Sequence, residues 1–204
     1  AFSQNVDNQI SYTINTDTKS YPDVILLSVQ GKGLIVNEKN GTGKYKAGAN
    51  YAGGLLATLN AQDLGANEAL YLDSAQNRYI DEAGSANIVI FTKDEKFITP
   101  SSDAILPSIT RRSVMELAES ELNLSTEARP IELRAEFSNF QEMAACGTAA
   151  VIAPVGKIWF DNDWRAVFED AESVGPLMSE LYELLVGIQR GEKEDKFGWL
   201  YNID

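Results

Sequence analysis

The chain has 204 residues, of which 44% are hydrophobic, and it carries a formal net charge of −13. A chain this acidic is not expected to bind nucleic acid, because nucleic-acid phosphates are met by basic side chains. It contains no histidine and one cysteine, Cys146, which excludes Ser-His-Asp and Cys-His catalysis and an internal disulfide.

No apolar run reaches the roughly 20 residues that a membrane-spanning helix needs. The polar first residues also lack the pattern of a signal peptide. We therefore expect no membrane partner and a cytoplasmic location, and any chemistry must use Lys, Tyr, Asp, Glu, Thr or a cofactor.

Short apolar runs predict several strands in the first half of the chain. The run Asp23–Val29 is typical of a buried strand, and "GLIVN" after a Gly-Lys-Gly turn favours a hairpin. A helix with Gly65 at its C-terminus is expected next. It carries four leucines at near-helical spacing: Leu55, Leu56, Leu59 and Leu64. "ALYLDS", "RYIDEAG", "ANIVIFT" and "KFITP" predict further strands.

The second half adds two longer helices. "TRRSVMELAESEL" places four apolar residues on one face: Val114, Leu117, Ala118 and Leu122. "RPIELRAEF" is expected to be extended, and "AAVIAPVGKIWF" to be a strand broken at Pro154. The last helix begins near Ser173 and Pro176 and ends at Gly191. Its apolar stripe has five members: Leu177, Leu181, Leu184, Leu185 and Ile188.

Strands that do not alternate regularly with helices indicate an α+β domain, or a mixed barrel-like sheet with flanking helices.

The glycine-rich stretch Gly41–Gly54, "GTGKYKAGANYAGG", does not fit a phosphate-binding loop. A Walker motif would place its first glycine at Glu38 and its Ser or Thr at Tyr45. The third glycine of the dinucleotide fingerprint is also missing. On its own, such a stretch is most often a turn before a helix.

Three other segments each allow a structural and a functional interpretation. Glu82 lies where a strand enters a turn, a position at which acids are usually solvated. Thr110 is expected to be an N-cap, although the free N–H groups of that helix start could bind an anion. Cys146 is expected to be a small buried hydrophobe, although "CGTAA" offers a second turn with a hydroxyl and exposed N–H groups.

Taken together, these segments supply a lysine, a carboxylate and two turns suited to anions. Pyridoxal phosphate (PLP) needs all three, because it forms a Schiff base with lysine, has a protonated ring nitrogen and carries a phosphate.

Five ordered motifs resemble those of the branched-chain amino acid aminotransferases, which are fold-type IV (class IV) PLP enzymes. They are "GTGKYKAGANYAGGLLA", "LYLDSAQNRYIDEAGSANIVIF", "TPSSDAILPSITRRSVMELA", "GTAAVIAPVGKIWF" and "GIQRGEKEDKFGWL". The resemblance covers about three quarters of the chain. It implies the large C-terminal domain of the D-amino-acid-aminotransferase-like fold over residues 41–204. Residues 1–40 are then a linker or the remnant of a small N-terminal domain.

The resemblance implies a role for each matching residue. Lys46 corresponds to the lysine that forms the internal aldimine, and Lys44 does not. Tyr51 corresponds to the tyrosine that meets the phenolic oxygen of the cofactor, and Glu82 to the acid that pairs with the ring nitrogen. The remaining correspondences are phosphate contacts at Ile109, Thr110 and Thr148, and substrate-carboxylate docking at Thr148 and Ala149.

The implied reaction is transamination of leucine, isoleucine or valine with 2-oxoglutarate by a homodimer, with Lys46 moving the proton. In the family pattern Ser108 is a glycine, and an N-terminal domain supplies an arginine to the phosphate. The 45 residues before Lys46 contain no arginine. Two alternatives therefore stay open: a truncated homologue acting as an interaction module, and another class IV enzyme, either a D-amino-acid transaminase or an aminodeoxychorismate lyase.

Overall fold

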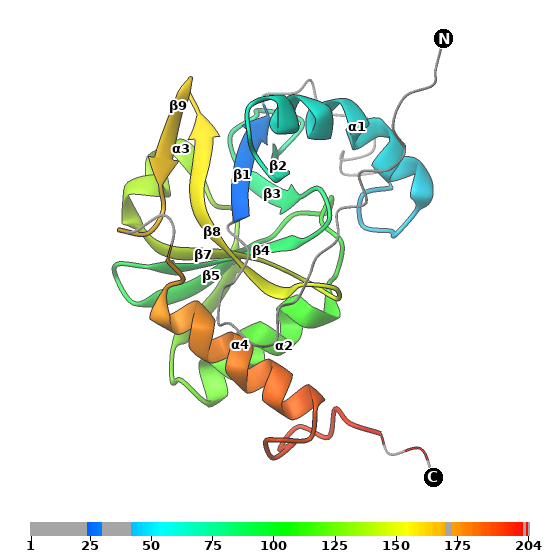
Figure 1. Cartoon of the computed structure of the whole chain (residues 1–204), viewed down its shortest axis with the longest axis vertical. Helices are drawn as coiled ribbons and strands as arrows, with labels where there is room; N and C mark the ends of the chain where they lie inside the picture. The colour runs from blue at the N-terminus through cyan, green and yellow to red at the C-terminus, as the bar shows by residue number, and fades with distance from the viewer. Residues whose placement is uncertain (1–23, 30–41, 170–172, 202, 204) are drawn as a thin grey trace.

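A computed structural model describes residues 24–29, 42–169, 173–201 and 203. These residues form one mixed sheet, with α1 over one part of it and α2 and α4 against another (Figure 1). The strand predicted at Asp23–Val29 is confirmed over Val24–Val29. The hairpin predicted after it lies outside the described residues.

The sheet runs in the order β3-β2-β1-β8-β7-β4-β5-β6, and β9 pairs with β8. β1 is parallel to β2 and β8, and β5 is parallel to β6, whereas the remaining pairs are antiparallel. The strands are β1 (Val24–Val29), β2 (Glu68–Leu72), β3 (Ile80–Ala83), β4 (Asn87–Thr92), β5 (Lys96–Pro100), β6 (Ser125–Arg129), β7 (Phe140–Gly147), β8 (Val151–Phe160) and β9 (Asp163–Ala166).

The helices are α1 (Gly48–Asp63), α2 (Ile109–Ser120), α3 (Leu133–Glu136) and α4 (Pro176–Gln189), and a 3₁₀ turn over Phe137–Asn139 follows α3. α2 and α4 pack against each other and against β7, while α1 contacts β1 and β2. Helices therefore flank a sheet of mixed pairing, which confirms the predicted fold class.

The two end strands of the sheet are brought together by backbone hydrogen bonds. The N–H of Ile80, at the start of β3, donates to the carbonyl of Ile131, just after β6, at 2.9 Å. The N–H of Leu133 donates to the carbonyl of Arg78 at 3.2 Å. These bonds curl the sheet on itself, which gives the barrel-like form that the sequence predicts.

The core follows the period-two alternation of the strands. Ile88 and Ile90 of β4 point into the barrel, where they join Met143 of β7. Val89 and Ala144 point the other way and pack under α2 and α4. β4 is therefore buried on both faces, which explains its nearly continuous apolar sequence.

α1 forms where the sequence predicts it and ends beside Gly65, whose φ of +80° suits a residue without a Cβ. The N–H of Ala66 closes this end on the carbonyl of Ala61 at 2.9 Å. The contact face of the helix is formed by alanines, including the fully buried Ala61. The four leucines of the predicted pattern are exposed by 46–69%: Leu55, Leu56, Leu59 and Leu64.

The expectation that "RPIELRAEF" is extended holds up to Glu132, which forms a bridge with Tyr79, and is wrong beyond it. Leu133–Glu136 form α3 because a local carboxylate caps the turn. Glu136 accepts a 2.8 Å hydrogen bond from the N–H of Glu132 and also binds both terminal nitrogens of Arg129. Leu133 is fully buried and anchors the turn to the barrel.

The predicted break at Pro154 is also wrong, because β8 continues through it. Pro154 pairs with Ala144 of β7, and the described part of β1 begins its pairing with β8 one residue later, at Val155. A proline interrupts a sheet only where a ladder bond needs its N–H.

The last helix begins as predicted at Pro176, but Ser173 is not its N-cap. The N-cap position is Gly175, which has no side-chain acceptor. Glu142 of β7 supplies the acceptors instead, taking hydrogen bonds from the N–H groups of Leu177 (3.2 Å) and Met178 (2.9 Å). Glu142 is 2% exposed, so this contact fastens α4 to the sheet from inside the core.

We predict that Glu142→Ala lowers the free energy of unfolding by about 1–3 kcal/mol, because two helix N–H groups lose a buried acceptor. Urea unfolding followed by circular dichroism measures the change. Glu116→Ala removes an exposed acid from α2 and should stay within about 0.5 kcal/mol. Equal stabilities for the two variants would contradict the capping role.

Candidate active site

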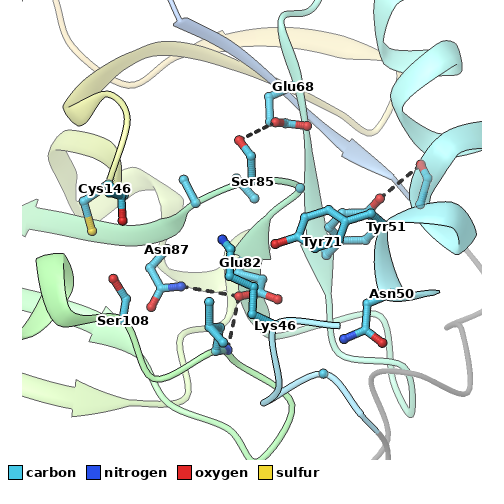
Figure 2. Close-up of a pocket in the computed structure, with 18 of the residues that line it drawn as sticks. Lys46, Asn50, Tyr51, Glu68, Tyr71, Glu82, Ser85, Asn87, Ser108 and Cys146 are labelled. Carbon is cyan, nitrogen blue, oxygen red and sulfur yellow. Dashed lines mark hydrogen bonds between the residues drawn. The ribbon is translucent and has the colours of Figure 1, made fainter. Parts of the chain in front are cut away.

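Five segments that lie far apart in the sequence surround a cavity of about 580 Å³ (Figure 2). They are the region around the start of α1, strand β2, the turn between β3 and β4, the segment before α2, and the turn between β7 and β8. Five predicted site residues line this cavity: Lys46, Tyr51, Glu82, Ile109 and Thr148. Thr110 and Ala149 adjoin two of them in sequence but are not lining residues.

Lys46 lies on the exposed loop over residues 42–47 that leads into α1. Its Nζ is 5.9 Å from the centroid of the Tyr51 ring, so the amine and the phenol are neighbours at the cavity. Lys44, two residues earlier, lies 5.5 Å from the ring centroid of Tyr45 and does not line the cavity. Of these two lysines, Lys46 therefore lines the cavity and Lys44 does not.

Asn50, in the first turn of α1, holds the loop of Lys46 in shape. Its Oδ1 accepts a 2.7 Å hydrogen bond from the hydroxyl of Thr42. Its Nδ2 donates to the carbonyls of Thr42 and Tyr45, each at 2.8 Å. One side chain therefore bonds both ends of the segment that precedes Lys46.

Glu82 of β3 is partly buried and projects into the cavity near Lys46 (Figure 2). Burial raises its pKa to about 7. The N–H of Leu106 lowers the pKa, Asp81 raises it, and the positive charges of Arg111 and Lys46 lower it. Glu82 makes no ion pair with a described side chain, so its charge lacks a close positive partner.

The side chain of Tyr71 in β2 explains why Gly54 of the glycine-rich stretch has no side chain. Its hydroxyl donates to the carbonyl of Gly54 at 3.3 Å, and a Cβ on Gly54 would lie 2.6 Å from the hydroxyl oxygen. Burial raises the pKa of Tyr71, and the charges of Glu68 and Glu82 add to the rise. Tyr71 therefore lines the cavity in its neutral form.

The N-terminus of α2 is capped by Ser108, and the expected cap, Thr110, lies inside the helix. Ser108 Oγ accepts from the N–H of Arg111 at 3.1 Å. The N–H groups of Ile109 and Thr110 have no acceptor among the described residues. Two donors at a helix N-terminus thus remain for an anion.

The turn after β7 has an exposed surface and a buried base. Thr148 and Ala149 are exposed, whereas Cys146 is fully buried beneath the cavity. Burial raises the pKa of Cys146 to about 12, which confirms it as a small apolar residue without nucleophilic character. The turn ends at Val151, whose φ of +59° is strained for a β-branched residue.

Sequence reasoning missed three residues that shape this cavity: Asn50, Tyr71 and Asn87. Asn50 follows Lys46 by four residues and Asn87 follows Glu82 by five, so their amides lie within the quoted motifs. An amide beside a turn commonly bonds local backbone groups, which is the signal that could have identified Asn50. The contacts of Tyr71 depend on the pairing of distant elements.

The described residues contain no group of three or more His, Cys, Asp or Glu side chains able to hold a metal ion. They also contain no helix long and apolar enough to cross a membrane.

The model of the family described as "Amino-transferase class IV" matches residues 6–158, so the chain belongs to this family. The branched-chain-amino-acid aminotransferase of Helicobacter pylori is 42% identical over 163 residues, which cover 80% of this chain and 46% of that protein. The enzyme of the same name from Haemophilus influenzae is 41% identical over 169 residues, covering 80% and 49%. The chain therefore spans about half the length of these relatives.

Solved structures show the same likeness. The branched-chain amino acid aminotransferase of Escherichia coli superposes with a TM-score of 0.73 at 30% identity, covering 88% of this chain and 57% of that chain. The branched-chain amino acid aminotransferase of Thermobaculum terrenum, solved in its PLP form, gives a TM-score of 0.71 at 28% identity, covering 83% and 52%. These likenesses agree with the class IV fold that the motifs predict.

We predict that Glu82→Gln makes the ligand-free protein more stable at alkaline pH. The folded state holds the proton of Glu82 up to about pH 7, whereas an unfolded glutamate loses it near 4.5. The stability of the parent should therefore fall as the pH rises from 4 to 8, an effect that glutamine removes. Allowing for partial exposure, the variant should be more stable by about 1–2 kcal/mol at pH 8.

Urea unfolding at pH 4, 6 and 8 measures this difference, and Glu116→Gln, at an exposed position, should show no comparable trend. A difference that widens toward acid pH would show that burial does not raise the pKa of Glu82.

Proposed function

We propose that this chain forms the PLP-binding part of a branched-chain amino acid aminotransferase. One observation carries the proposal: distant segments bring a primary amine, a phenol, a partly buried carboxylate, two helix N–H groups without an acceptor and a threonine turn to one cavity. Each group matches a different chemical need of the same cofactor. Assembly as a homodimer and a cytoplasmic location belong to the same proposal.

The residues of the cavity fit PLP on physical grounds. Glu82 is a desolvated carboxylate with no ion-pair partner among the described side chains, and its raised pKa shows that its charge is poorly compensated. A protonated ring nitrogen would supply the missing positive charge. The free N–H groups of Ile109 and Thr110, together with the Thr148 hydroxyl, would hold the phosphate.

When bound, the cofactor supplies an electron sink for the charge that forms at the substrate Cα. Lys46 would hold the cofactor covalently through Nζ and, once released, move a proton from the substrate Cα. Tyr51 lies beside Lys46 and would donate a hydrogen bond to the phenolic oxygen. Glu82 would keep the proton on the ring nitrogen by ionising against it.

The names of the similar proteins support branched aliphatic substrates. A further branched-chain amino acid aminotransferase of known structure, 27% identical to this chain with a TM-score of 0.74, has been solved in complex with 4-methylvaleric acid, a branched carboxylic acid. The same enzyme has been solved with N-(5'-phosphopyridoxyl)-L-glutamate. We infer that this chain uses leucine, isoleucine or valine as the amino donor and 2-oxoglutarate as the acceptor. The substrate carboxylate would dock at Thr148 and Ala149, in the exposed turn after β7.

The covalent role of Lys46 is tested by adding PLP, reducing with borohydride and mapping the modified lysine by mass spectrometry. We predict labelling at Lys46, its loss in Lys46→Ala, and its persistence in Lys44→Ala. The two lysines lie on the same exposed loop, so accessibility alone cannot explain a difference between them. Equal labelling of both, or labelling elsewhere, would overturn the proposal.

The substrate assignment is tested by following transfer from L-leucine or L-valine to 2-oxoglutarate. We predict that these L-amino acids are preferred over their D-enantiomers and that Glu82→Gln slows the transfer by at least about 100-fold, since a neutral amide cannot hold the ring proton. Preference for D-amino acids would favour the D-amino-acid transaminases. Labelling of Lys46 without any transfer would favour a binding module.

A further inference from the structure

Asn87, the first residue of β4, is an unusual polar residue at the base of the cavity. It is 3% exposed, and it pairs with Cys146 of β7 in the sheet. Its Nδ2 lies 3.4 Å from Glu82 Oε2 (Figure 2). Its Oδ1 is buried without a hydrogen-bond partner, the one side-chain atom of this kind among the described residues.

The two oxygens of Glu82 have different surroundings. Oε2 accepts from Asn87 Nδ2 at 3.4 Å and from the N–H of Leu106 at 3.3 Å. No described group donates a hydrogen bond to Oε1. Both donors converge on one oxygen, so the second oxygen remains available to a ligand in the cavity.

We propose that Asn87 is a positioning residue that, together with the N–H of Leu106, fixes Glu82 Oε2 so that Oε1 is presented to a cationic ring nitrogen. This inference rests on the proposed function, in which Glu82 pairs with such a nitrogen. Asn87 itself does not touch the ring: it acts through Glu82.

The orientation of the Asn87 amide supports this role. With Nδ2 toward Glu82, the amide donates a hydrogen bond to the ionised carboxylate. The opposite orientation would present Oδ1, which could accept a hydrogen bond only from the O–H of neutral Glu82. The observed orientation therefore stabilises the charged form and leaves Oδ1 unpaired, at a cost that burial of a polar atom makes appreciable.

Leu106 connects Glu82 to the segment before α2, where the proposed phosphate contacts begin. Leu106 lies two residues before Ser108, the N-cap of α2, and both line the cavity. The hydrogen bond from Leu106 thus joins the acid to the segment that leads to the free N–H groups of α2. Glu82 Oε2 is therefore held by two donors of different kinds. Asn87 belongs to the sheet, whereas Leu106 belongs to the segment that leads into α2.

The test is the titration of Glu82 in the cofactor-free protein, followed by carbon NMR with ¹³C-labelled glutamate. Asn87→Ala removes the donor, so the pKa of Glu82 should rise by about 0.5 or more. Asn87→Asp keeps the shape but adds a negative charge, so the rise should be larger. The charged groups facing Glu82, namely Asp81, Lys46 and Arg111, are unchanged in both variants.

Asn139→Ala is the matched control. It removes another asparagine that donates to a carboxylate, that of Asp94 at 2.7 Å, away from the cavity. The control should leave the pKa of Glu82 and the affinity for PLP unchanged, whereas Asn87→Ala should weaken PLP binding by about three- to tenfold. Circular dichroism shows whether each variant is folded, and Asn87→Leu, which is close in volume and also lacks the donor, decides the matter if Asn87→Ala is not folded.

A folded Asn87 variant in which Glu82 titrates as in the parent would overturn the inference. If the parent binds no PLP, the proposed function fails. The titration in cofactor-free protein still decides whether Asn87 holds Glu82 Oε2. The two proposals can therefore fail separately.

Discussion

The register of β3 is the constraint on which the site depends. β3 is a short end strand that pairs on one side with β2, and its first N–H bonds the segment after β6. The pairing is irregular between Leu72–Ile80 and Leu70–Ala83, so Asp81 and Glu82 lie where the ladder shifts, and a change of register would re-aim both acids. In the observed register Asp81 turns away and accepts from Ser102 at 2.8 Å, while Glu82 enters the cavity.

Closure of the sheet therefore has an electrostatic consequence. Burial raises the pKa of Asp81 to about 6 and that of Glu82 to about 7, so both acids are poorly solvated. The two acids meet different groups: Asp81 accepts from the hydroxyl of Ser102, whereas Glu82 lies in the cavity that Lys46 also lines. A cationic ligand would relieve the cost of charging Glu82, and by linkage an ionised Glu82 would hold that ligand more tightly.

Much of this fold was predictable because it follows local apolar periodicity. The strands around Ile88 and Ile98 and the helix around Leu117 are examples in which burial follows the sequence pattern. α3 was not predictable in this way, because it depends on a carboxylate, Glu136, that returns to cap its own turn. The cap of α4 by Glu142 was also hidden, since the two groups lie 36 positions apart along the chain.

The residues of the site also divide into those that a local motif indicates and those that depend on three-dimensional contacts. Motif resemblance pointed to Lys46, Tyr51 and Glu82, because each lies in a quoted motif, and all three line the cavity. The supporting amides were not identified, because their roles depend on geometry. Asn50 matters through the carbonyls that it reaches, and Asn87 through the one oxygen of Glu82 that it contacts.

Ser108 shows how a change in the family pattern can be accommodated in the segment that leads into α2. The family pattern has glycine there, and a side chain in its place could crowd the turn. The backbone of Ser108 has φ −77° and ψ 131°, an extended conformation open to any residue, and its side chain caps α2 by accepting from Arg111. The cap uses the third N–H of the helix and leaves those of Ile109 and Thr110. Serine therefore stabilises the helix start at no cost to the two donors that an anion would need.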